Sequence, residues 1–128
     1  MAASQGRGGG AFDPADHVVR KLRDERLRWV DCGDGRSVQV LVLRETEMLR
    51  LLREPLVDIV VSQAVGWKGF TEAKLFGAHD GSADELPFRA DLWDAVARDS
   101  FDIVERVGQV IKEHAESVME QRAAAKKA

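Results

Sequence analysis

Hydrophobic residues change their spacing several times along the chain, and each change predicts a different element. Within residues 26–43, apolar and polar residues alternate in two short segments on either side of Asp34-Gly35. Such alternation is typical of half-buried strands, and an Asp-Gly pair favours a tight turn because both residues tolerate a positive φ. We therefore predict a β-hairpin, which has to pack against helices because two strands alone are barely stable. Its expected apolar positions are Leu27, Trp29, Val38, Val40 and Val42.

Helical spacing predicts elements on both sides of this hairpin. A short helix is expected to begin after Asp13, which is a good N-cap, with Pro14 at its first position. Behind the hairpin, Thr46 is expected to cap a second helical pattern, whose apolar positions cluster on one side: Met48, Leu49, Leu51 and Leu52. Pro55 interrupts that pattern, because a proline inside a helix removes a hydrogen bond. The pattern resumes and stops at Gly66, which suits a C-terminal cap, so either two helices meet at Pro55 or one helix is kinked there.

The second half of the chain is also mainly helical in pattern. The β-branched residues 59–61 leave a strand open as an alternative to helix at that point. Residues 71–76 are expected to form one helical turn, and residues 77–87 a loop rich in turn-forming residues. A helix is predicted from Phe88, and a longer one follows, in which Gly108 costs up to about 1 kcal/mol relative to alanine. The apolar faces of these two helices are Leu92, Trp93 and Val96, and then Phe101, Val104, Val107, Ile111 and Val118.

Together these elements predict an α+β fold that is mostly α-helical, with one N-terminal β-hairpin packed on a small helical bundle. At 128 residues the chain fits a single domain, which we place at residues 12–122. The glycine-rich residues 1–11 carry no apolar pattern and are expected to form a disordered tail. Residues 123–128 are expected to form a frayed C-terminal tail.

Charge and hydropathy narrow the classes of function. The net charge of -3 disfavours a general nucleic-acid binder, which normally carries a basic excess. The basic residues within 20–28 alternate with Asp24 and Glu25, so this stretch is interpreted as a solvated, salt-bridged face rather than a phosphate-binding surface. No apolar run approaches the length of a membrane span, and the N-terminal residues lack the apolar stretch of a signal peptide. We therefore expect no membrane contact and a cytoplasmic location.

Residues that could support catalysis or metal binding are few and scattered. The histidines form none of the pairs typical of zinc sites and are far apart in sequence: His17, His79 and His114. The acidic residues of the loop do not follow the spacing of an EF-hand calcium site: Asp80, Asp84 and Glu85. The single cysteine, Cys32, lies in an expected turn without a histidine or basic residue beside it, and we interpret it as an incidental small residue. We expect no enzymatic activity, no metal and no cofactor.

The stretch A-V-G-W-K-G-F (64–70) places the bulky Trp67 between two glycines. In one interpretation Gly66 ends a helix, Trp67 folds back to close the end of the core, and Gly69 lets the chain reverse before Phe70. In the other, the ring belongs to a surface that binds a partner, since tryptophans often anchor protein interfaces. In a domain of this size the core interpretation is favoured for any one aromatic residue.

Several segments also occur in an order that is found in a known family. R-W-V-D-C-G-D-G-R-S-V-Q-V (28–40) forms the expected hairpin, and T-E-M-L-R-L-L (46–52) begins a helix. A-V-G-W-K-G-F then contains a Gly-Trp-x-Gly followed by an apolar residue, and L-P-F (86–88) precedes an acidic helix with a tryptophan. In this order, over residues 26–122, the chain resembles the small tail assembly chaperones of tailed bacteriophages and prophages. The N-terminal helix and glycine-rich tail have no counterpart in that family.

This resemblance implies a non-enzymatic role in tail morphogenesis, in the cytoplasm of the bacterial host. Such chaperones bind the long, helical tape measure protein, keep it soluble and present it for polymerisation of the tail tube protein. A partner of this kind calls for a groove of apolar and aromatic side chains. Our candidate partner-binding residues are Trp67, Phe70, Phe88 and Trp93.

Other interpretations stay open at this point. The main alternative is a structural virion component, such as a tail or head-to-tail joining protein. A small regulatory nucleic-acid-binding domain is a further one. The pattern is also compatible with homo-oligomerisation, and its lysine-rich end with a longer, frameshifted product.

Overall fold

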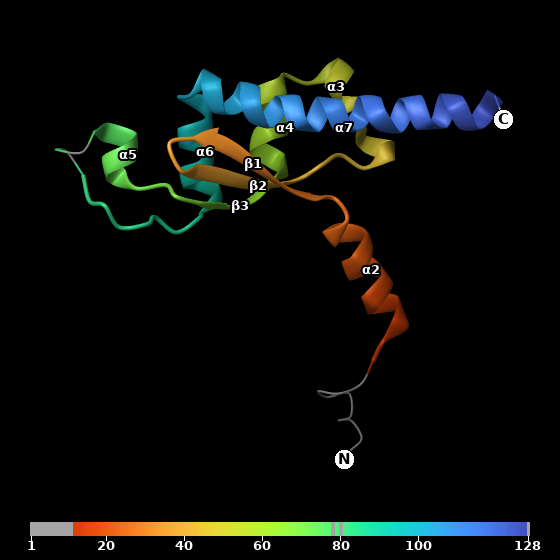
Figure 1. Ribbon diagram of the computed structural model, residues 1–128, viewed down its shortest axis with the longest axis horizontal. Helices are drawn as coiled ribbons and strands as arrows, with labels where there is room; N and C mark the ends of the chain where they lie inside the picture. The colour runs from red at the N-terminus through yellow and green to blue at the C-terminus, as the bar shows by residue number, and fades with distance from the viewer. Residues whose placement is uncertain (1–11, 78, 80, 128) are drawn as a thin grey trace, which may run out of the picture.

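The computed structural model describes residues 12–77, 79 and 81–127. Figure 1 shows its elements, which in chain order are α2 (Pro14–Asp24), β1 (Leu27–Gly33), β2 (Arg36–Leu41), the 3-10 helix η1 (Glu45–Glu47), α3 (Arg50–Arg53), α4 (Leu56–Gln63), β3 (Ala64–Lys68), α5 (Glu72–Phe76), α6 (Ala90–Arg98) and α7 (Phe101–Lys127). The fold is mixed and mostly helical, with an antiparallel sheet, as the sequence predicts. The disordered tail predicted for residues 1–11 lies outside the described residues.

The predicted hairpin is present as β1 and β2, which pair in antiparallel register. Its turn places Asp34 at a φ of 57° and Gly35 at 71°. Both values lie in the left-handed region that a tight hairpin turn requires, which is why the Asp-Gly pair predicted it. The hairpin therefore forms where the turn residues and the alternation of apolar and polar residues both predict it.

A third strand, β3, extends this hairpin, and the sequence analysis missed it. β3 pairs antiparallel with β2, so that Gly66 lies opposite Gln39. The prediction that Gly66 ends a helix is wrong: α4 ends at Gln63, and Ala64 is already extended. The side-chain amide of Gln63 donates to the carbonyl oxygen of Leu41 at 2.7 Å, which holds the point where helix changes to strand beside β2. The predicted alternative strand at residues 59–61 is helical.

The inner face of the sheet forms the centre of the core. Val30, Val38 and Trp67 lie side by side across the three strands and are buried. Cys32 and Val40 occupy the same face and are buried as well. Helices α4, α6 and α7 lie against this face, and their buried residues join one hydrophobic cluster with it.

The outer face of the sheet is left open, and this corrects the face predicted for β1. Trp29 lies opposite Gln39 on this face and is about half exposed. The ammonium of Lys68 sits 4.3 Å from the centre of the Trp29 ring, an attractive cation–π geometry. Val30 and Cys32, rather than Leu27 and Trp29, carry β1 into the core. β1 carries apolar residues on both of its faces, so periodicity alone did not show which face is buried.

A proline separates two helices, as predicted. Helices α3 and α4 meet at Pro55, which is the N-cap of α4, so the alternative with two helices is confirmed. Thr46 does not cap a helix, because it lies within η1. The backbone N–H of Arg44 there donates to the Glu47 carboxylate at 2.9 Å. This local cap lets the chain leave the sheet and turn into α3.

The long helix α7 has 27 residues, spans about 40 Å at 1.5 Å per residue and runs from beside the sheet to the C-terminus (Figure 1). Its buried stripe confirms Val104, Val107 and Ile111, whereas Phe101 at its first position is exposed. A Cβ on Gly108 would lie 2.5 Å from Cδ2 of Leu56, so the glycine lets α4 pack closely on α7. The helix continues through Lys127, and the residues predicted as a frayed tail are helical and exposed up to that point.

Helix α2 stands apart from this body. Asp13 caps it as predicted, accepting from the backbone N–H of Ala15 at 2.9 Å, and Pro14 is its first residue. None of the residues of α2, all of which are described, is buried, and the helix points away from the sheet and the helices behind it. Across the described ranges, no helix has both the length and the apolar character needed to cross a bilayer.

Candidate partner-binding groove

The structure brings the candidate aromatic residues Trp67, Phe70, Phe88 and Trp93 together in one cluster, which we call the aromatic cluster. Trp67 and Phe70 stack with ring centres 4.2 Å apart. Phe88 and Trp93 meet the Trp67 ring edge-on, at 5.6 Å and 6.4 Å. The two edge-on contacts are favoured arrangements, because the positive edge of one ring meets the negative face of another.

The aromatic cluster belongs to the core. Trp67, Phe70 and Trp93 are buried, and Phe88 is half-buried against them. Both indoles are also satisfied: Nε1 of Trp67 donates to the Leu86 carbonyl at 2.8 Å, and Nε1 of Trp93 to the Val61 carbonyl at 3.2 Å. The rings therefore bind the loop before α6 to β3, and a role for them in partner binding stays a prediction.

Gly69 makes this arrangement fit. Its φ of 82° bends the chain directly after β3, and a Cβ here would collide with the carbonyl oxygen of Gly35. The bent backbone also presents the Gly69 N–H to the Glu85 carboxylate, at 2.8 Å and 2.9 Å from its two oxygens. Next along the chain, the Phe70 carbonyl accepts from the N–H of Leu86 at 2.8 Å. The chain therefore bends at Gly69, but the predicted reversal before Phe70 is not observed, because the chain continues from β3 into α5 (Figure 1).

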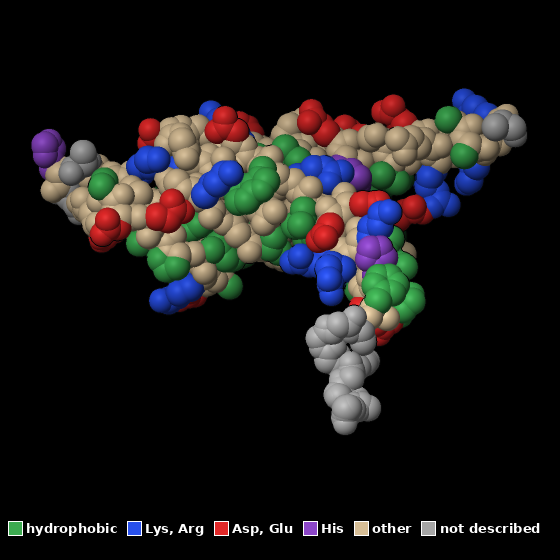
Figure 2. Space-filling view, turned by 60° about the horizontal axis from the view of Figure 1, so that its bottom comes forward, with side chains coloured by type: hydrophobic (Ala, Val, Ile, Leu, Met, Phe, Trp, Pro, Cys, Tyr) green, Lys and Arg blue, Asp and Glu red, His purple; other side chains and the backbone are tan. Residues whose placement is uncertain are grey.

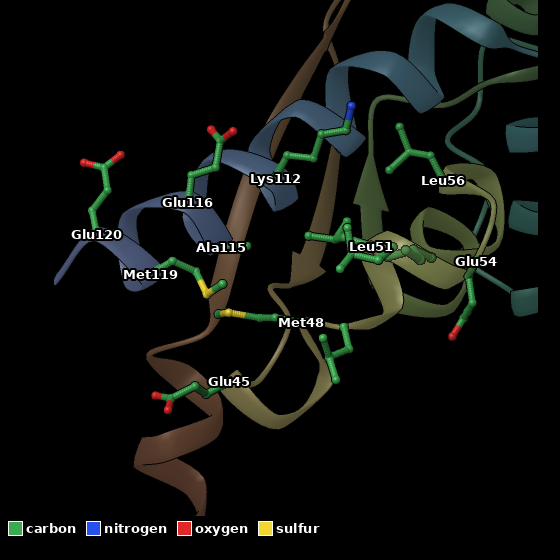
Figure 3. Close-up of a pocket in the computed structure, with 13 residues that line it drawn as sticks. Glu45, Met48, Leu51, Glu54, Leu56, Lys112, Ala115, Glu116, Met119 and Glu120 are labelled. Carbon is green, nitrogen blue, oxygen red and sulfur yellow. The ribbon is translucent and has the colours of Figure 1, made fainter. Parts of the chain in front are cut away.

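A different apolar surface is open to solvent. It is a groove of about 840 Å³ between η1 and α3 on one side and the C-terminal half of α7 on the other, with α4 at one end. Figure 3 shows Met48 and Met119 pointing toward one another across it. The apolar side chains that line this groove include Met48, Leu49, Leu51, Leu52, Leu56 and Met119.

Several of these side chains are not covered by any residue in the described part of the chain. Leu52 leaves 83% of its surface exposed and Met119 leaves 61%. A single exposed leucine is ordinary in a folded protein, whereas several in one concave surface mark a site for a ligand or a partner. The groove therefore has the character of an unfilled binding surface.

Charged residues surround the groove. Glu45 forms an ion pair with Arg122, and Glu54 forms one with Arg50 at 2.8 Å. The hydrogen bond from Arg50 lowers the pKa of the Glu54 carboxyl. Along α7 the rim changes from Lys112 at its inner end to Glu116 and Glu120 toward the C-terminus.

Sequence reasoning missed this groove because it assigned every leucine of residues 48–52 to one face. The segment folds as the very short η1 and α3, so Met48 turns inward while Leu49 and Leu52 turn outward. The sequence did contain one signal, which is the run of apolar residues within 48–52, just before Pro55. A helix as short as the four residues of α3 cannot bury apolar side chains on all its sides, so part of this run has to stay exposed.

The groups weighed for chemistry do not gather in one place. Cys32 lies buried on β1 rather than in a turn, and burial raises the pKa of its thiol to about 11. Burial, with the nearby Arg28 charge, lowers the pKa of His114. Within the described ranges, no three metal-ligating side chains come together. Glu85 instead binds the Gly69 N–H, and Asp80 lies outside the described residues.

Comparison with known proteins adds no relative. The chain matches no protein-family model, no curated protein and no solved structure.

Proposed function

We propose that the protein is a non-enzymatic tail assembly chaperone of a tailed bacteriophage or prophage, and that it binds the tape measure protein in this groove. The observation that carries the proposal is the open apolar groove, in which Leu52 and Met119 are exposed beside the buried Met48. The sequence resemblance supports it, through the hairpin at residues 28–40 and the Gly-Trp-x-Gly of residues 66–69.

A helical client fits the chemistry of the groove. The tape measure protein is a long helix-rich chain that presents apolar stripes before the tail tube encloses it. An amphipathic helix binds a groove of this kind by placing apolar residues three and four positions apart into it. Methionines suit such a site because their flexible side chains adapt to different apolar partners.

The proposal moves the partner surface away from the aromatic cluster. Trp67, Phe70 and Trp93 lie buried behind the sheet, so they support the groove indirectly by holding β3 and α6 in place. In this view the groove is the binding surface. The scaffold that supports it is the hairpin packed on a small helical bundle and enlarged by β3. The protein would act in the host cytoplasm and leave before the particle is complete.

The first test is genetic. The DNA flanking this gene is expected to contain an overlapping downstream frame followed by one very long, helix-rich reading frame. Ordinary metabolic genes on both sides would contradict the proposal.

The second test is co-expression of the full chain with the product of that long reading frame. The wild-type chain is expected to keep the long protein soluble and to copurify with it. Leu52→Glu should abolish the complex, because a carboxylate would enter the apolar groove. Phe101→Glu is the matched control. Phe101 is 80% exposed, close to the 83% of Leu52, but it lies at the N-terminal end of α7, whereas the groove lies along the C-terminal half of that helix. A Leu52→Glu chain that still copurifies would sink the groove as the binding site. Recovery of the chain in finished particles would favour a structural virion component instead.

A further inference from the structure

Helix α2 carries an apolar stripe that the described residues of its own chain leave uncovered. Val18 and Val19 lie four and three positions before Leu22, so all three share one side of the helix. Val19 is 66% exposed and Leu22 is 61% exposed, and before the helix the exposed Phe12 lies with its ring against that of His17. Figure 2 shows hydrophobic side chains gathered on this projecting helix. We call Phe12 and α2 together the arm.

Hydrogen bonds at its base fix the arm in this position. Only two residues separate α2 from β1. The carbonyl of Arg26 accepts from the N–H of Val42 at 2.8 Å, and Nε of Arg26 donates back to the Val42 carbonyl at 3.2 Å. The guanidinium of Arg28 donates to the Glu25 carbonyl at 2.7 Å. The arm is therefore anchored to the sheet at its C-terminal end, and its stripe is held away from the groove of its own chain.

We propose that the arm docks in the groove of a second copy of this chain, and that two chains exchange arms to form a symmetric dimer. The same exchange in both directions closes the assembly, as a two-fold axis requires. The proposal needs only a second copy, so it does not rest on the proposed function; if both hold, the arm and the tape measure protein compete for the same groove.

The lengths of the two surfaces agree. The 11 residues of α2 span about 16 Å as an α-helix. The groove wall on α7 from Lys112 to Glu120 spans about 12 Å at the same rise per residue. Val19 and Leu22 can thus both face the apolar floor that Leu52 and Met119 leave open.

The charges of the two surfaces also agree, and they set a direction. The arm is acidic at its N-terminal end, with Asp16, and basic in its last turn, with Lys21 and Arg23 on either side of Leu22. The α7 wall runs the other way in sign, from Lys112 to Glu116 and Glu120. Within the described part of the chain, neither of these glutamates takes part in an ion pair. An arm lying parallel to α7 therefore pairs opposite charges at both ends.

The direct test is the mass of the full chain in solution, measured by sedimentation over a range of concentrations. The wild-type chain is expected to dimerise. Leu22→Glu in the arm and Leu52→Glu in the groove should each weaken the dimer by about a hundredfold, because each variant damages both contacts by at least about tenfold. Phe101→Glu should leave the dimer unchanged. A wild-type chain that stays monomeric, or a Leu22→Glu chain that dimerises as well as the wild type, would overturn the proposal.

Disulfide trapping tests the pairing itself. A Leu22→Cys chain mixed with a Met119→Cys chain should form a cross-linked heterodimer under mild oxidation. Cys32 is buried and should not interfere. A mixture of Leu22→Cys with Phe101→Cys is the control and should give no such product. If one chain with both Leu22→Cys and Met119→Cys forms an internal disulfide and remains monomeric, the arm covers its own groove and the proposal is wrong.

Charge exchange tests the direction of docking. Arg23→Glu should weaken the dimer several-fold at low salt, and Glu120→Lys should do the same. A chain that carries both changes should regain the wild-type affinity, because the pair is restored with its signs reversed. Two single effects that simply add in the double variant would exclude the parallel arrangement.

Discussion

The aromatic cluster and the groove are both apolar, yet their side chains end in opposite situations. In the aromatic cluster, Trp67 touches three other rings, and its indole N–H has a carbonyl partner. In the groove, Leu52 and Met119 face solvent beside residues that are themselves buried. The aromatic cluster is packed within the chain, whereas the groove is open to solvent.

This difference teaches that residue type is a weaker guide to a binding surface than the shape of the surface. Tryptophans are favoured at interfaces, and that preference selected Trp67 and Trp93 as candidates. Here the large rings close the core of a small domain. Leu52 stays exposed in the groove instead, because α3 has only four residues and cannot bury all its sides.

The largest expected effect is on the aromatic cluster. Trp67→Ala should lower the free energy of unfolding by about 3–5 kcal/mol, because it leaves a cavity among Phe70, Phe88 and Trp93. Denaturant titration followed by circular dichroism measures this change. A variant that unfolds like the wild type would show that Trp67 is not part of the core and would return it to the list of partner contacts.

A smaller loss is expected from Gly69→Ala, which disturbs the bend that brings Phe70 under Trp67. The positive φ and the collision with the Gly35 carbonyl should together cost at least about 2 kcal/mol. Gly66→Ala is the matched control in the same motif, because its Cβ would lie 3.5 Å from Oε1 of Gln39 in ordinary contact. Equal stabilities for the two variants, measured by thermal unfolding, would contradict the role given to Gly69.

The thiol of Cys32 offers a further check on how tightly the core beside the aromatic cluster is closed. Burial raises its pKa from the ordinary 9.0 to about 11, so the folded state keeps a proton that the unfolded state releases. The stabilising effect is complete below pH 9 and is lost as the pH rises from 9 to about 11. Unfolding measured across this range should show an alkaline loss that Cys32→Ala lacks. The chain has no tyrosine, so thiolate absorbance can be followed directly. Rapid labelling of native Cys32 at neutral pH would contradict a closed core.

The smallest effect on stability is expected in the groove. Leu52→Ala should change the free energy of unfolding by no more than about 0.5 kcal/mol, as is usual for exposed positions. The comparison with Trp67→Ala in the same titration gives the contrast between the two regions. A large loss for Leu52→Ala would mean that the groove is filled in the folded chain and is not an open surface.

Local chemistry made much of the fold predictable. The Asp34-Gly35 turn, the Asp13 cap and the break at Pro55 all depend on preferences of residues next to one another in the chain. Helical spacing predicted the buried stripe of α7, except at Phe101. This residue is the first of the helix, and none of the described residues covers its ring.

The sequence by itself therefore determined the hairpin turn, the start of α2 and the break at Pro55, because turns, caps and proline breaks are local. Only the tertiary structure decided that residues 64–68 form a third strand, since that depends on pairing with β2, distant in sequence. It also decided which apolar residues are covered. Trp67 packs against Phe70 and against Trp93 of α6 and is buried, while Leu52 and the arm are left uncovered by the described residues of their own chain, because burial depends on what packs against a side chain.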